Sequence, residues 1–93
     1  MIHSGIPLDA VFDHIDAQSD SFVSRLIDYV RHPSISAQDI GIREVSALLV
    51  DILKGLGMQA EAVSTSGHPM VLGRRGDDPS KPTVLLYGHY DVQ

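Results

Sequence analysis

The chain has 93 residues, enough for one small domain, and no cysteine, so it has no disulfide framework. Its net charge of −5, from 7 basic and 12 acidic residues, argues against nucleic acid as a partner. No apolar run approaches the roughly 18 residues that a membrane-spanning helix needs, and residues 1–7 lack the basic and apolar regions of a signal peptide. We therefore expect a soluble, cytoplasmic protein that binds neither nucleic acid nor a membrane.

Apolar side chains recur at helical spacing between residues 8 and 31, which predicts an amphipathic helix. Pro33 ends this pattern. The polar stretch 17–21 is only weakly helix-forming, so the helix is expected to bend there or to protrude past its neighbours. His14 and His32 are candidate metal ligands by residue type, but a solvent-facing and a helix-end position explain them better.

The turn 33–36, Pro-Ser-Ile-Ser, precedes a second predicted helix over residues 38–55, which carries a wide apolar stripe. Ser36 followed by Asp39 resembles a capping box. No base is spaced to activate either serine as a nucleophile, so capping is the expected role. Gly57 stands where a left-handed C-terminal cap is expected.

Two short extended runs, 58–64 and 70–73, flank five turn residues, which predicts an antiparallel hairpin. His68 precedes a proline in this turn and is expected to be exposed. The long charged loop 74–82 follows. Its two arginines are suited to an anion, but two acidic residues come directly after them and weaken that field, so a solvated loop is favoured.

Residues 83–87 form a continuous run of strand-forming residues, typical of a strand covered on both faces in an α/β sheet. Gly88 breaks the run, and His89 and Asp91 follow at the carboxyl edge, where ligands gather in such sheets. Residues two apart on an extended backbone lie on one side, roughly 6–7 Å apart. Asp91 can therefore reach the imidazole and hold it for metal binding. On spacing alone, a histidine that simply meets water remains the alternative.

Residues 84–93, Val-Leu-Leu-Tyr-Gly-His-Tyr-Asp-Val-Gln, resemble the first metal-ligand motif of the M20 family of zinc metallopeptidases. This family contains dipeptidases, carboxypeptidases, deacylases and desuccinylases. The motif is most similar to the dipeptidase, carnosinase-like branch, because deacetylase and desuccinylase relatives more often carry threonine at Tyr90 and valine at Gln93. The turns at 33–36 and 56–58 also occur in family order.

The resemblance implies that His89 binds one of two zinc ions, or manganese or cobalt in their place, and that Asp91 is the catalytic group that braces it. The bridging aspartate, the general-base glutamate and the remaining ligands would belong to sequence after residue 93. The implied reaction is hydrolysis of an amide bond in a dipeptide or an N-acyl amino acid. The intact enzyme is expected to form a homodimer.

The order helix, helix, strand, strand, loop, strand predicts an α/β fold. Two helices would pack on a mixed sheet made of the hairpin and a buried parallel strand. Because the chain stops at its most hydrophobic strand, we expect residues 1–93 to be the N-terminal part of a single catalytic domain. The alternative is a complete 93-residue protein. Alone, the chain is expected to be inactive, to bind zinc weakly and to self-associate.

Two further functions stay open. A zinc-free homologue would keep the fold as a binding or scaffold domain, and an amino-acid deacylase or desuccinylase would use the same metal chemistry on another substrate. A nucleotide-binding domain is disfavoured, because no glycine-rich phosphate loop follows any predicted strand.

Overall fold

The structure is a computed structural model that describes residues 7–92. The chain divides into two compact units, Met1–Arg31 and His32–Gln93. Residues 1–6, which were expected not to form a signal peptide, lie outside the described residues. Gln93, which was used to choose the dipeptidase branch, also lies outside them. Among residues 7–92, no helix is long and apolar enough to cross a membrane.

The first unit consists of α1, Leu8–Val30. Pro7 precedes the helix with a φ of −75°, a backbone angle that suits a helix start, and Arg31 follows its last residue. The helix is continuous through the polar residues 17–21, the stretch where a bend or a protrusion was predicted. Its apolar stripe is formed as predicted, and none of its residues is buried within this unit.

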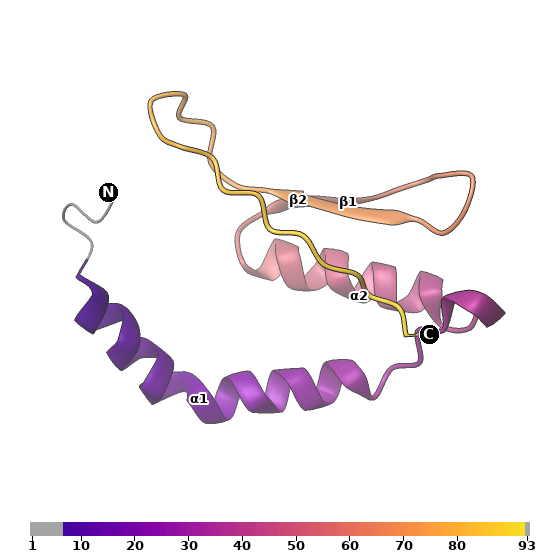
Figure 1. The fold of residues 1–93 in the computed structure, drawn as a ribbon, viewed down its shortest axis with the longest axis horizontal. Coiled ribbons are helices and arrows are strands. Elements are labelled where there is room, and N and C mark those ends of the chain that lie inside the picture. The colour runs from indigo at the N-terminus through magenta and orange to yellow at the C-terminus, as the bar shows by residue number, and fades with distance from the viewer. Residues whose placement is uncertain (1–6, 93) are drawn as a thin grey trace. The chain divides into compact units, whose positions relative to one another are not determined.

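The second unit combines α2, Ile42–Gly55, with an antiparallel hairpin of β1, Gln59–Val63, and β2, Met70–Arg74. Helix α2 packs against both strands and lies along one face of the hairpin (Figure 1). The pairing runs from Gln59 opposite Arg74 to Val63 opposite Met70. Helices and a sheet in one chain confirm the predicted α/β class, and the hairpin lies where the turn residues placed it.

A short 3₁₀ turn, η1 (Ser36–Gln38), separates the Pro-Ser-Ile-Ser loop from α2. Helix α2 therefore starts four residues later than residue 38. Two residues explain the delay: Asp39 has a φ of 51° and Gly41 a φ of 75°, both in the left-handed region, where a right-handed helix cannot continue. At the other end of α2, Gly57 has a φ of 85°, as its predicted capping position requires.

The most deeply buried side chains lie where α2 begins. Ile42 and Val45 are 2% and 1% exposed, and Ser34 and Ser46 are buried with them. Gly41 is required here, because a β-carbon on it would lie 1.8 Å from the Pro33 carbonyl oxygen. The Pro33 carbonyl thus lies directly against the backbone of Gly41, which leaves no room for a side chain where α2 begins.

Residues 83–87 do not form the predicted buried parallel strand. They are extended but have no strand partner among residues 7–92, and the side chains from Val84 to Tyr87 are 79–93% exposed. A continuous apolar run favours a strand only when neighbouring backbone and covering helices are available, and no described residue supplies them. A single parallel bridge, Ile35 with Val92, forms downstream of this run.

Candidate metal-ligand segment

The segment that carries His89 and Asp91 is attached to the Pro-Ser-Ile-Ser loop. The Val92 amide donates a hydrogen bond of 2.7 Å to the Ser34 carbonyl, next to the bridge between Ile35 and Val92. The Ser34 hydroxyl returns a bond of 2.5 Å to the Tyr90 carbonyl. In Figure 1 the yellow C-terminal segment accordingly ends beside the chain that leads into α2.

His89 and Asp91 are in direct contact. The Nδ1 atom of His89 lies 3.0 Å from the Asp91 carboxylate oxygen Oδ1 and 3.0 Å from the Asp91 backbone carbonyl. The imidazole is 71% exposed, whereas the carboxylate is 27% exposed. The aspartate therefore reaches the imidazole edge, as the two-residue spacing predicts. The ring is exposed to solvent, whereas the carboxylate that holds it is partly buried.

Ser36 holds the second oxygen of this carboxylate. Its hydroxyl donates a hydrogen bond of 2.5 Å to Asp91 Oδ2. The bond from Ser36, and then the bond from His89, lower the pKa of the Asp91 carboxyl below its ordinary value, because both stabilise the charged form. Asp91 is therefore ionised near neutral pH.

An ionised Asp91 determines which nitrogen of His89 carries the proton. A carboxylate can only accept, so the Nδ1 atom beside it must be the donor. In the neutral ring this leaves Nε2 with a free lone pair, the atom that a metal ion would bind. Both hydrogen bonds of the ring use Nδ1, so neither occupies Nε2.

The role predicted for Ser36 is wrong. Its hydroxyl does not cap a helix: α2 has no side-chain cap, and the Ser36 hydroxyl points to Asp91 instead. The sequence pattern Ser-x-x-Asp could not reveal this, because the partner stands 55 residues away in the chain. The role of Ser34 was missed for the same reason.

The turn of the hairpin is also tied to this region. The Tyr90 hydroxyl donates to the Pro69 carbonyl. His68 is exposed, as predicted, but its Nε2 donates to the Ser36 carbonyl at 2.9 Å and its Nδ1 lies 3.6 Å from the Asp39 carboxylate. Loop, hairpin turn and motif segment therefore support one another.

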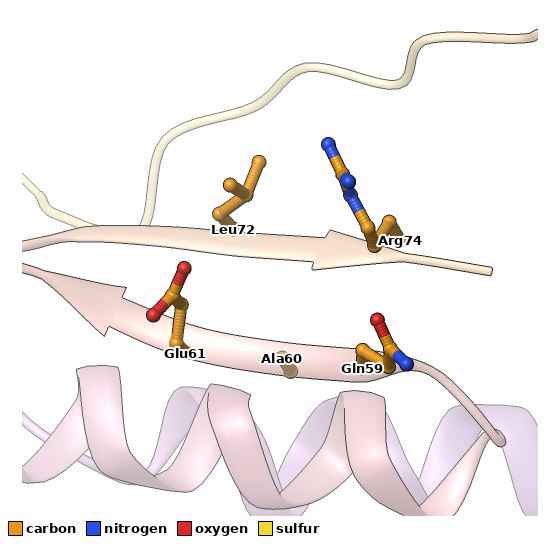
Figure 2. Close-up of a pocket in the computed structure, with 5 residues that line it drawn as sticks. All are labelled: Gln59, Ala60, Glu61, Leu72 and Arg74. Carbon is orange, nitrogen blue, oxygen red and sulfur yellow. The ribbon is translucent and has the colours of Figure 1, made fainter.

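An open cavity of about 430 Å³ lies elsewhere, on the hairpin (Figure 2). Its lining side chains belong to β1 and β2: Gln59, Ala60, Glu61, Leu72 and Arg74. Figure 2 shows Glu61, Leu72 and Arg74 projecting from the face of the hairpin opposite α2. Of the two arginines considered above as anion ligands, Arg74 lines this cavity, and Arg75 donates to the Leu56 carbonyl at 3.2 Å. The cavity contains neither His89 nor Asp91.

Zinc sites need three or four protein ligands. Within residues 7–92, no group of three or more histidine, cysteine, aspartate or glutamate side chains is placed to hold a metal ion. The chain therefore offers one imidazole with a braced ring as a donor. An imidazole with one nitrogen hydrogen-bonded to a carboxylate, as Nδ1 of His89 is, is the arrangement in which zinc commonly binds the other nitrogen.

Comparison with curated proteins finds relatives across nearly the whole chain. It is 38% identical to the Cys-Gly metallodipeptidase DUG1 of Candida albicans over 104 residues, and 39% identical to that of Schizosaccharomyces pombe over 100 residues. It is 35% identical to the Beta-Ala-His dipeptidase of Mus musculus over 107 residues. These matches cover 95%, 92% and 98% of the chain, in that order.

The chain spans only about a fifth of the length of these relatives, 21%, 21% and 22%. No family model and no solved structure matches it. Identity of 35–39% across more than nine tenths of the chain is nevertheless far more than a ten-residue motif could produce. Over nearly its whole length, the chain is therefore a homologue of a segment of these dipeptidases, two of which are named as metallodipeptidases, and that segment makes up about a fifth of their length.

Proposed function

We propose that this chain is the N-terminal part of the catalytic domain of a metal-dependent dipeptidase, in which His89 binds a metal ion and Asp91 orients it. The observation that carries the proposal is the contact between His89 Nδ1 and Asp91 Oδ1, which leaves Nε2 unprotonated in the neutral ring. The relatives support it, since they are named as dipeptidases and two of them as metallodipeptidases.

The metal is zinc in this proposal, as two ions, because neutral imidazole and carboxylate are ligands that zinc takes readily. Zinc in such a site supplies Lewis-acid activation of the amide carbonyl and of water. His89 supplies one donor nitrogen. The further ligands, the bridging aspartate and the general-base glutamate come from parts of the protein outside this chain.

Asp91 acts through His89. By accepting the Nδ1 proton it selects the ring tautomer, and by holding the ring edge it fixes the direction in which Nε2 points. Its negative charge also makes the imidazole a stronger donor. Asp91→Asn, which removes the charge but keeps the shape of the side chain, should therefore slow turnover without removing a direct metal ligand.

The substrate in this proposal is a dipeptide. The relatives are named for Cys-Gly and for Beta-Ala-His, which are chemically different dipeptides, so the shared feature is the length of the substrate rather than one side chain. Within this proposal the intact enzyme is a cytoplasmic homodimer, and residues 1–93 alone are inactive because most ligands are missing.

The test uses the purified full-length protein. We expect bound zinc and hydrolysis of Cys-Gly or of β-Ala-His, with little hydrolysis of N-acetyl amino acids. His89→Ala should abolish turnover and lower the zinc content. Asp91→Asn should keep zinc largely bound but slow turnover about 10–100-fold, the usual loss for a group that braces a metal ligand.

The control is His14→Ala, which removes another histidine whose ring lies edge-on to Phe22 on α1. It should leave zinc content and turnover unchanged. Full activity of His89→Ala would refute the role of this residue. A protein without zinc and without hydrolysis of any tested amide would indicate a binding or scaffold domain, and preferential hydrolysis of N-acetyl amino acids a deacylase.

A further inference from the structure

The two oxygens of the Asp91 carboxylate have separate partners. Oδ1 accepts from His89 Nδ1 at 3.0 Å, whereas Oδ2 accepts from the Ser36 hydroxyl at 2.5 Å. A carboxylate held at one oxygen only can rotate about its bond to the chain. A second, charge-assisted hydrogen bond restricts that rotation and thereby fixes the oxygen that faces His89.

Ser36 itself is fixed by contacts that do not involve residues 89–91. The backbone of the preceding residue, Ile35, pairs with Ile40 through two hydrogen bonds of 2.8 and 3.1 Å. The Ser36 carbonyl accepts from His68 Nε2 at 2.9 Å. The hydroxyl is thus presented from a loop with its own support, so it can position Asp91 rather than follow it.

We propose that Ser36 is a positioning residue of the metal site, which acts on His89 through the carboxylate of Asp91. This inference rests on the proposed function of His89 as a metal ligand. It adds one residue to that function: Asp91 orients His89, and Ser36 orients the carboxylate of Asp91.

A purely structural role for Ser36, joining the loop to residues 90–92, is the competing explanation. Ser34 already performs that role, because its hydroxyl binds the Tyr90 carbonyl and its carbonyl accepts from the Val92 amide. Ser34 does not contact the carboxylate through these bonds. The two serines therefore form a matched pair, one bonded to the backbone of the motif and one to the side chain that holds His89.

The first experiment measures zinc affinity of the metal-free, full-length protein by competition with a chromophoric chelator. Ser36→Ala should weaken zinc binding by up to about tenfold, the lower end of the losses seen for outer partners of metal ligands. Ser36→Thr keeps the hydroxyl and should retain most of the affinity. Ser36→Cys has a weaker donor and should lie between them.

The control is Ser80→Ala. The Ser80 hydroxyl also donates to an aspartate, Asp78 Oδ1 at 2.6 Å, but in the loop after β2. It should leave zinc affinity unchanged. Circular dichroism and thermal unfolding check that every variant is folded. If Ser36→Ala does not fold, the graded series from serine through threonine to cysteine still decides the matter.

The second experiment observes the ring directly. In metal-free protein, ¹⁵N NMR of His89 distinguishes the tautomer protonated at Nδ1 from the one protonated at Nε2. Ser36→Ala should reduce the share of the Nδ1-protonated form, and Ser34→Ala should leave it as in the wild type. A role in docking alone would not move this signal.

A double-mutant cycle identifies the route of the effect. If Ser36 acts through Asp91, then Ser36→Ala should change zinc affinity in the wild type but not in an Asp91→Ala background. An equal effect in both backgrounds would overturn the proposal, as would wild-type affinity and tautomer in Ser36→Ala. Unchanged zinc binding in His89→Ala would instead overturn the proposed function, so the two failures are distinguishable.

Discussion

Ser36 and Asp91 are joined by a hydrogen bond of 2.5 Å across 55 residues of sequence. This bond links the loop before α2 to the segment that carries His89 and Asp91. The hydrogen bonds that Ser36 and His89 donate to Asp91 both favour its charged form and so lower its pKa. The pKa of Asp91 therefore reports whether these bonds are formed.

The first prediction concerns the pKa of Asp91 in the metal-free protein. It should lie below the value of about 3.9 typical of aspartate, and Ser36→Ala should move it upward, since the larger of the two side-chain hydrogen bonds that lower it is lost. Titration of the ¹³C-labelled carboxyl by NMR measures this. Ser80→Ala should move only Asp78, whose pKa is lowered by the same kind of bond. An unchanged Asp91 pKa in Ser36→Ala would contradict the prediction.

The same shift predicts the direction of a pH effect. A carboxyl whose pKa is lower in the folded protein stabilises the fold above its unfolded pKa, and that contribution disappears as the pH falls through the folded pKa. The attachment of residues 90–92 to the loop 33–36 should therefore weaken in acid. Amide hydrogen exchange at Val92, which donates to Ser34, should quicken relative to its intrinsic rate on acidification, and do so less in Ser36→Ala.

Gly41 should tolerate no side chain. Its φ of 75° is left-handed, and a β-carbon would lie 1.8 Å from the Pro33 carbonyl oxygen. Gly41→Ala should lower the free energy of unfolding by about 2 kcal/mol or more. Gly55 is the matched control, since nothing lies within 4 Å of the corresponding position at the end of α2. Gly55→Ala should be neutral or stabilising by up to about 1 kcal/mol. Denaturant unfolding compares the two, and equal effects would be inconsistent with the clash.

Tyr90→Phe should detach the hairpin turn from the motif segment while leaving His89 and Asp91 in place. The variant removes the hydrogen bond from the Tyr90 hydroxyl to the Pro69 carbonyl. The expected loss is about 0.5–1.5 kcal/mol in the free energy of unfolding. Zinc affinity should stay close to that of the wild type, because this hydrogen bond goes to the Pro69 carbonyl, whereas the His89 ring is held by Asp91. A large loss of affinity would show that the hairpin turn helps to position His89.

Residues 84–87 should cause self-association of residues 1–93 produced alone. Val84, Leu85, Leu86 and Tyr87 are 79%, 86%, 86% and 93% exposed and adjacent in an extended segment, a surface that pairs readily with other chains. Light scattering after size exclusion should detect oligomers. Leu85→Lys should reduce them, and Leu56→Lys, at another exposed leucine, should do so less. A monodisperse monomer of the unmodified chain would refute this prediction.

Local patterns in the sequence were enough to predict the helices, the hairpin and the contact between His89 and Asp91. Helical spacing of apolar residues predicted α1 and most of α2, and turn residues between extended runs predicted the hairpin, because these signals depend on neighbours a few positions apart. The contact between His89 and Asp91 was predictable for the same reason, since two residues along an extended chain place their side chains together.

Other features depend on residues that are distant in the sequence and meet only in the folded chain. The local sequence predicted that Ser36 caps a helix, yet its hydroxyl donates to the Asp91 carboxylate, 55 residues away in the chain. A pattern of neighbouring residues carries no information about such a distant partner. The start of α2 was set by left-handed backbone angles at Asp39 and Gly41, and Gly41 lies against the Pro33 carbonyl. Residues 83–87 have the composition of a buried strand but not its structure, because a strand is made by its neighbours as much as by its own side chains.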